Sequence, residues 1–193
     1  MARLDDADTD PAPGPSGEVT ERILARRGGT LTPLDRMLLH SPPIADGWNA
    51  LLGAVRTGAE LADDVRELAV LRVATLNGAD YEWRAHEPVG RDAGLGDTEI
   101  AVLRGGTAGD GATGDGAMGA RADDVLAPRL AAALAYTDAM TRHVTVPDAV
   151  FAALGDHFDD REIVELTATV AAYNLVSRFL VALQVGEQRR DAA

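Results

Sequence analysis

The sequence contains no cysteine, which excludes disulfide bonds, thiolate nucleophiles and cysteine-ligated metal sites. Aromatic residues are also scarce, at 4% of the chain, although 46% of the residues are hydrophobic. Alanine, leucine and valine must therefore fill the core, and such small side chains let helices pack closely. With 193 residues, the chain suits a single domain.

Positive charge is in short supply as well. The chain has 31 acidic residues against 18 basic ones, a formal net charge of -13, and no cluster of Lys and Arg. Binding to nucleic acid or to an anionic membrane is therefore not expected. We find no apolar run of the roughly 18–20 residues that a transmembrane helix needs. The first residues lack the apolar segment of a secretory signal. We therefore predict a cytoplasmic protein whose partner is a small molecule.

Motifs for metals and phosphates are missing too. The sequence has no His-Glu-x-x-His, and no two histidines share a predicted helix at the spacing of metal ligands. The glycine-rich stretch at 105–121 lacks the Gly-Lys-Ser/Thr ending of a phosphate-binding loop. We therefore predict no metal and no cofactor.

Composition divides the chain into one folded domain and three irregular stretches. Residues 1–17 are rich in Asp, Pro and Gly and predict a disordered tail. The glycines of 105–121 predict a flexible loop, and 186–193 a short C-terminal tail. The domain between the tails covers 18–185. Helical periodicity and end signals predict helices at 18–27, 33–40, 43–57, 63–77, 80–93, 97–104, 123–142, 147–157 and 160–185. No segment alternates with the period of a strand, so we predict an all-α fold.

Two helices are apolar on nearly every side. They span 65–76 and 163–183, and this pattern predicts that both are buried. Polar residues within such helices are either paired or functional. Glu67 is one of them, with Val70, Leu71 and Ala74 as neighbours on the helix. These apolar flanks predict a carboxyl group that ionises with difficulty, which suits proton transfer. The alternative is that Glu67 only forms a capping box with Asp64.

Glu82 and His86 lie four residues apart and therefore share one helical face. Ala85, Val89 and Ala93 fall on the same side, which predicts that this face meets the core. A carboxyl group and an imidazole on an apolar face form a candidate acid–base pair. The alternative is a purely structural hydrogen bond between them, which could also include Glu67.

A third polar set follows one stripe of the last helix and comprises Thr167, Asn174 and Arg178, with Tyr173 to one side. The guanidinium of Arg178 is suited to binding a substrate carboxylate. The alternative is a subunit contact or an internal ion pair.

The helices that carry Glu67, Glu82 and His86 together have a familiar pattern. Residues 66–74 (RELAVLRVA), 77–83 (NGADYEW) and His86 resemble the core signature of the carboxymuconolactone decarboxylase family, which is related to the alkylhydroperoxidase D proteins. Weaker similarity extends to 39–43, 47–48, 160–166 and 173–174, so that the resemblance covers about 30–104 and 122–185. It implies an all-α helical bundle with a buried central helical hairpin, assembled as trimers or hexamers.

The resemblance also implies roles for individual residues. The peroxidase branch of the family has a Glu, a Cys-x-x-Cys pair and a His, and these positions correspond here to Glu67, to Ala79 and Glu82, and to His86. Both cysteines are replaced, so disulfide-based peroxidase chemistry is not expected. Without the two cysteines, the site resembles that of the decarboxylase branch, which uses neither cysteine nor cofactor.

In that branch, the substrate is a carboxylated unsaturated lactone or a similar small acid. Loss of carbon dioxide leaves a dienolate that must be protonated. Our hypothesis is that His86 is the general acid, that Glu67 orients it and that Glu82 is a second acid or hydrogen-bond partner. The residues expected to contact substrate are Tyr81, Trp83, Asn174 and Arg178.

Two other functions stay open at this point. One is a hydroperoxidase-like redox protein, which the missing cysteines disfavour. The other is a non-enzymatic oligomeric protein that binds a small molecule. A lack of space between Glu67 and His86 would favour this last interpretation.

Overall fold

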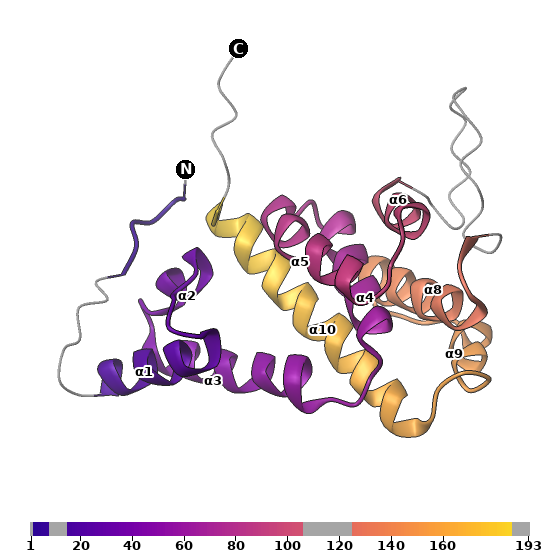
Figure 1. Ribbon diagram of the computed structural model, residues 1–193, viewed down its shortest axis with the longest axis horizontal. Helices are drawn as coiled ribbons and strands as arrows, with labels where there is room; N and C mark the ends of the chain where they lie inside the picture. Colours follow the sequence, from indigo (N-terminus) through magenta and orange to yellow (C-terminus); the bar gives the residue numbers. More distant parts are fainter. Residues whose placement is uncertain (1, 8–14, 106–124, 187–193) are drawn as a thin grey trace, which may run out of the picture. The chain divides into compact units, whose positions relative to one another are not determined.

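The computed structural model describes residues 2–7, 15–105 and 125–186, and within these ranges it contains helices and no strand (Figure 1). The predicted all-α fold is confirmed. The helices are α1 (Pro15–Arg27), α2 (Pro33–Leu38), α3 (Pro42–Gly53), the short π-helical segment η1 (Ala54–Gly58), α4 (Asp63–Leu76), α5 (Asp80–Asp92), α6 (Asp97–Gly105), α8 (Pro128–His143), α9 (Asp148–Leu154) and α10 (Asp160–Leu183).

The predicted irregular stretches lie mostly outside the described residues. This holds for 8–14 of the predicted N-terminal tail, for 106–121 of the predicted loop and for 187–193 of the C-terminal tail. The first helix begins at Pro15 and not at residue 18, and α8 begins at Pro128 and not at residue 123. The single domain at 18–185 remains a prediction.

The chain divides into two compact units. One consists of Met1–Ala59 together with Arg178–Ala193, and the other of Glu60–Ser177. In the first unit, Thr32 caps α2 through a capping box with Asp35, next to Pro33 at the first helical position. Trp48 and Phe179 pack edge to face in the same unit, with ring centroids 5.2 Å apart. The second unit contains the residues that carry the predicted acid–base chemistry.

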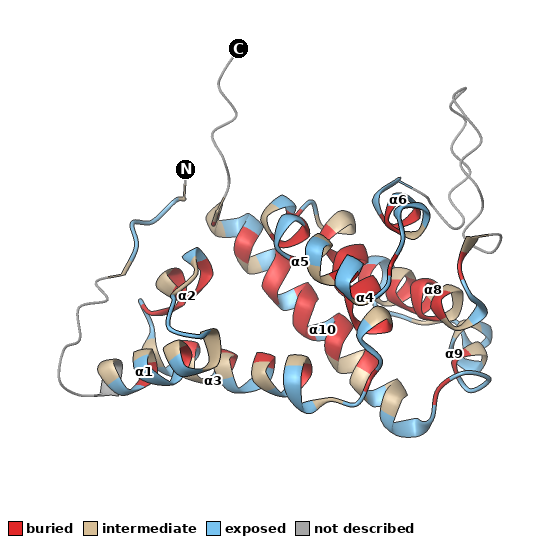
Figure 2. Ribbon diagram, in the orientation of Figure 1, coloured by how far each residue is buried: buried red, intermediate tan, exposed pale blue. Residues whose placement is uncertain are grey.

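Helix α4 is the centre of the second unit. Every residue from Val65 to Ala74 is buried, and Figure 2 shows this helix in the colour of buried residues. It contacts α5, α6 and α8. Helices α4 and α5 form the predicted central hairpin, which turns at Asn77 and Gly78. Gly78 has φ +65°, a backbone conformation that favours glycine at the end of a helix.

The hairpin is tightly packed at Gly90 of α5. A Cβ atom at this position would lie 3.0 Å from Leu71 Cδ1 and 3.2 Å from Leu95 Cδ1, and also 3.6 Å from Glu67 Cβ. Only glycine leaves this contact unstrained, so Gly90 lets α5 approach the face of α4 that carries Glu67.

Helix α10 departs from the sequence prediction. Leu166, Tyr173 and Leu180 are buried, but Val164 and Leu175 are 66% and 47% exposed. The prediction that this helix is buried on every side is therefore wrong for one face. By length and composition alone, α10 is also apolar enough to cross a membrane, contrary to our expectation that no such segment exists. Core helices can also be long and apolar enough to meet this criterion, and α10 has the buried side chains of such a helix.

A buried ion pair fixes the other end of α4. Arg72 is 2% exposed, and its Nε and Nη2 donate to the two carboxylate oxygens of Asp138 on α8, at 2.5 and 2.7 Å. Its Nη1 donates to the carbonyl oxygen of Leu103 at 3.2 Å. One guanidinium therefore joins α4, α6 and α8.

This geometry predicts a large effect of Asp138→Ala. The substitution leaves the Arg72 guanidinium buried and without its counter-charge, which should lower the free energy of unfolding by about 3–5 kcal/mol. Chemical denaturation measures this loss. The control is Asp46→Ala, which breaks the exposed pair between Arg22 and Asp46 and should leave the free energy of unfolding almost unchanged. Equal losses in the two variants would contradict a structural role for the buried pair.

Candidate active site

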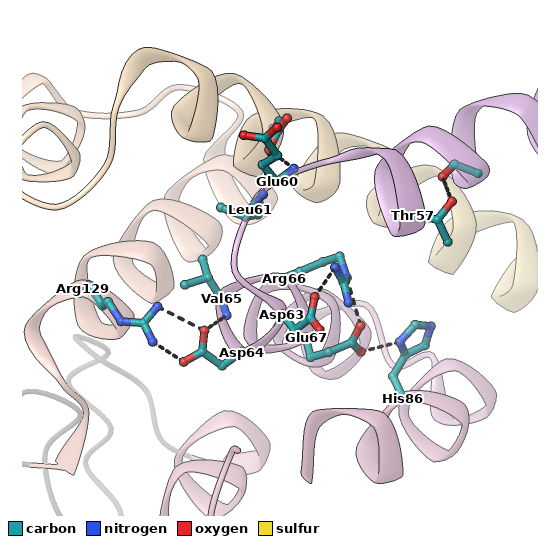
Figure 3. Close-up of polar contacts among 12 residues, drawn as sticks. Thr57, Glu60, Leu61, Asp63, Asp64, Val65, Arg66, Glu67, His86 and Arg129 are labelled. Carbon is teal, nitrogen blue, oxygen red and sulfur yellow. Dashed lines mark hydrogen bonds and ion pairs between the residues drawn. The ribbon is translucent and has the colours of Figure 1, made fainter. Parts of the chain in front are cut away.

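The structure brings Glu67 and His86 into direct contact. Glu67 projects from α4 and His86 from α5, and His86 Nδ1 lies 2.7 Å from Glu67 Oε2 (Figure 3). Both side chains are buried, with 1% and 6% of the residue exposed. The close packing at Gly90 makes this contact sterically feasible, because it draws the two helices together one turn beyond His86.

Glu67 has a second cationic partner. Arg66 Nε donates to Glu67 Oε1 at 3.3 Å, and Arg66 Nη1 donates to Asp63 Oδ1 at 2.8 Å. Burial on its own would raise the pKa of Glu67, but the hydrogen bond from His86 and the charges of His86 and Arg66 outweigh it and lower the pKa. The expectation that Glu67 ionises with difficulty is therefore wrong.

The capping-box alternative for Glu67 is also wrong. The N-cap of α4 is Ala62, without a side-chain cap. Asp64 is ion-paired with Arg129 and accepts a hydrogen bond from the Val65 backbone, as Figure 3 shows. The Glu67 carboxylate points to His86 instead.

The Glu67 carboxylate determines which imidazole nitrogen carries the proton. An ionised carboxylate only accepts hydrogen bonds, so Nδ1 of His86 must be the donor. This leaves Nε2 as the atom that exchanges a proton with a reacting molecule. The hydroxyl of Tyr173, on α10, lies 3.4 Å from Nε2. Sequence reasoning placed Tyr173 beside a polar stripe and gave it no role, and only the approach of α10 to α5 reveals the contact.

Glu82 lies one helical turn before His86 and is 2% exposed. Neither of its carboxyl oxygens has a hydrogen-bond partner among the described residues. Burial raises the pKa of Glu82 to about 9. Its position in the first turn of α5 favours the anion by only about 0.3–1 kcal/mol, less than one pKa unit, so burial dominates. Glu82 is therefore a neutral carboxylic acid at neutral pH. The structural hydrogen bond to His86 that we considered is not formed.

The buried face of α5 differs in part from the predicted one. It carries Glu82, Trp83, His86 and Gly90, whereas Ala85 is exposed. Val89 and Ala93 are only half-buried. The core-facing side was therefore predicted correctly for the two polar residues, and Ala85 was placed on the wrong side.

The residues expected to bind substrate have mainly structural contacts. Trp83 is buried, donates from Nε1 to Glu87 at 2.8 Å and is covered by Arg104, whose guanidinium carbon lies 4.7 Å from the ring centroid. Tyr81 is half-buried in the first turn of α5. Substrate binding by these two residues stays a prediction.

The predicted stripe on α10 does not form one cluster. Asn174 donates to Thr141 Oγ1 and to the Val170 carbonyl oxygen, both at 3.0 Å, and accepts from Asn77 at 3.1 Å. Thr167 is hydrogen-bonded to Tyr136 at 2.8 Å. Arg178 is exposed and belongs to the other compact unit. A role of Asn174 or Arg178 toward substrate stays a prediction. No group of three His, Asp or Glu side chains suited to a metal occurs within 15–105 and 125–186.

Comparisons with known proteins agree with the resemblance seen in the sequence. The model of the carboxymuconolactone decarboxylase family matches residues 42–122, a range that includes Glu67, Glu82 and His86. The comparison with curated proteins found no match.

Three solved structures are similar over most of the chain. A peroxidase-related protein from Silicibacter sp. TM1040 is 19% identical, with TM-score 0.73 over 95% of this chain and 90% of its own. An alkylhydroperoxidase AhpD core protein from Ralstonia eutropha JMP134 is also 19% identical, with TM-score 0.69 over 97% and 95%. A protein from Agrobacterium tumefaciens, described as of unknown function and AhpD-like, is 24% identical, with TM-score 0.63 over 78% and 94%.

At these identities, the three structures show a shared fold and no more. The family match and the fold agree, and they do so in a chain that has no cysteine. Residues 42–122 match the carboxymuconolactone decarboxylase family, and the chain shares its fold with the AhpD-related solved structures.

Proposed function

We propose that this protein is a cofactor-independent lyase or isomerase of the decarboxylase type, acting on a small carboxylated unsaturated lactone or a related acid. The observation that supports it best is a buried His86–Glu67 pair next to Glu82, a buried carboxylic acid without a partner. These groups supply a proton acceptor, a proton donor and a fixed counter-charge, and none of them needs a thiol.

In the decarboxylation, the bond between the substrate carbon and its carboxylate breaks, and carbon dioxide leaves. The electron pair remains in the conjugated system as a dienolate. Protonated His86 then delivers the Nε2 proton to carbon, and water restores the proton afterwards. The Glu67 carboxylate stabilises the imidazolium and holds the ring by Nδ1, as an orienting carboxylate does for a catalytic histidine.

Glu82 is suited to a second role at the same face of α5. As a neutral acid, it donates a hydrogen bond to the carbonyl oxygen on which negative charge develops, where an anionic carboxylate would repel that charge. Its unpaired oxygens are costly in the resting protein, and a substrate oxygen supplies the missing partner.

A hydroperoxidase function is a weaker proposal, suggested only by the names of the three similar structures. Peroxide reduction of this kind needs a thiolate that attacks oxygen and a second thiol that resolves the product, and the chain has neither. A binding protein is the other alternative. The direct contact of Glu67 with His86 leaves no space between them, which is the outcome expected of this alternative. Turnover requires instead that a reacting molecule reaches Nε2, on the opposite side of the ring.

The first test is turnover of carboxymuconolactone, the lactone in the family's name, followed by release of carbon dioxide. His86→Asn should lower the rate by about 10²- to 10⁴-fold, the usual contribution of a general acid. Glu67→Gln should also lower it, because the ring loses its counter-charge. Related unsaturated lactones and acids are assayed in parallel, with ligand-dependent shifts in Tm as the binding readout.

The matched control for His86→Asn is His143→Asn, since His143 is exposed at the end of α8. This variant should retain the parent rate. Full turnover in both His86→Asn and Glu67→Gln would contradict the acid–base assignment. Binding without turnover in the parent would support the binding-protein alternative.

A second prediction concerns Glu82 and pH. The folded protein keeps the Glu82 proton up to about pH 9, whereas the unfolded chain loses it near the ordinary pKa of 4.5. The unfolded state therefore binds fewer protons between these values, so this group lowers stability as pH rises. Glu82→Gln removes the titration, and its Tm relative to the parent should increase from about pH 5 to about pH 8.

Thermal unfolding at several pH values measures this difference. Glu21→Gln, at an exposed position on α1, is the control and should show no pH-dependent gain. A constant Tm difference between Glu82→Gln and the parent across this range would contradict a neutral Glu82.

The redox alternative has its own test. Incubation with cumene hydroperoxide and dithiothreitol should give no consumption of peroxide above the rate without protein, because no thiol is present in the chain. Protein-dependent consumption that is lost in His86→Asn would support the hydroperoxidase function against the decarboxylase one.

A further inference from the structure

Tyr173 is buried at the Nε2 side of His86, opposite the Glu67 carboxylate. It is 2% exposed, and its ring meets the imidazole edge to face, with centroids 5.1 Å apart and an interplanar angle of 89°. Its hydroxyl oxygen lies 3.4 Å from His86 Nε2. The imidazole is therefore held on one side by a carboxylate of α4 and on the other by a phenol of α10.

The contact serves both protonation states of the ring. When His86 is neutral, the proton is on Nδ1, and Nε2 accepts a hydrogen bond from the Tyr173 hydroxyl. When His86 is protonated, Nε2 donates and the hydroxyl oxygen accepts. A phenol can do both, which a carboxylate or an ammonium group at the same place could not.

The length of the contact also matters. At 3.4 Å, it exceeds the usual range for hydrogen bonds of this kind, about 2.7–3.2 Å, and is therefore weak. A substrate atom or a water molecule that reaches Nε2 can replace it at little cost. By contrast, the bond between Nδ1 and Glu67 is 2.7 Å long and charge-assisted, so the ring stays anchored while the partner of Nε2 changes.

We propose that Tyr173 is a positioning residue of this site, whose hydroxyl forms a hydrogen bond with Nε2 of His86, steadies the imidazole ring and yields its place to the substrate. The role in catalysis rests on the proposed function. The hydrogen bond and the tautomer are independent of the proposed function, and both are tested without any substrate.

The test is nitrogen-15 NMR of the full chain with labelled histidine, recorded at a pH at which the neutral imidazole is observed. His86→Asn identifies the His86 signals among the four histidines. In the parent, Nδ1 should be the protonated nitrogen, and Nε2 should show the upfield shift of a hydrogen-bonded acceptor. In Tyr173→Phe, the Nε2 signal should move downfield, while Nδ1 stays protonated.

Tyr136→Phe is the matched control. It also removes a buried tyrosine hydroxyl with a partner on α10, in this case Thr167, and it should leave both His86 signals unchanged. A merely structural role of Tyr173 would lower the Tm of both variants alike without moving Nε2. An unchanged Nε2 signal in Tyr173→Phe, or a proton on Nε2 of the parent, would overturn the proposal.

A second measurement keeps the Tyr173 hydroxyl, so it stays informative even if Tyr173→Phe does not fold. The chain has three tyrosines, so a Tyr81→Phe/Tyr136→Phe protein carries Tyr173 alone. Fluorotyrosine in that protein is a stronger donor and should move Nε2 further upfield. No change on fluorination would also overturn the proposal. If the Nε2 signal shifts as expected but no substrate is turned over, the hydrogen bond is confirmed and the proposed function is wrong.

Discussion

Helix α4 is buried at every residue from Val65 to Ala74, and its charged side chains must therefore find partners inside the protein. Arg72 meets Asp138, and Arg66 and Glu67 form a chain with Asp63 and His86. The contact of Arg72 with Asp138 ties α4 to α8, and that of Glu67 with His86 ties α4 to α5. The need to neutralise charge on a fully buried helix thus organises the second unit. The contact between Glu67 and His86 at the candidate site is one of the contacts that meet this need.

Two carboxyl groups of the site show how the environment gives chemically identical side chains different pKa values. Glu67 and Glu82 are buried to the same extent, yet the pKa of Glu67 is lowered and that of Glu82 is raised to about 9. The difference lies in their partners, because Glu67 has His86 and Arg66, whereas Glu82 has none among the described residues. One group is therefore a fixed negative charge and the other a proton donor, an arrangement that suits acid–base catalysis.

Glu82 also bears on how the family's fold can change chemistry. In the resemblance to the peroxidase branch, this position corresponds to a cysteine, and the Glu and His positions are kept at Glu67 and His86. A thiol at position 82 would bring redox chemistry beside the histidine. A neutral carboxylic acid brings a proton there instead.

The sequence by itself determined the helices, the burial of 65–76 and the shared face of Glu82 and His86, because periodicity and end signals are local properties of the chain. The hairpin of α4 and α5 was expected only from the family resemblance. The sequence did not determine the ionisation of Glu67, which depends on a histidine 19 residues away, or the missing partner of Glu82. Nor did it place Tyr173 at Nε2, since that contact joins residues 87 positions apart. Only tertiary structure decided these points, because the pKa and tautomer of a buried group depend on what packs against it.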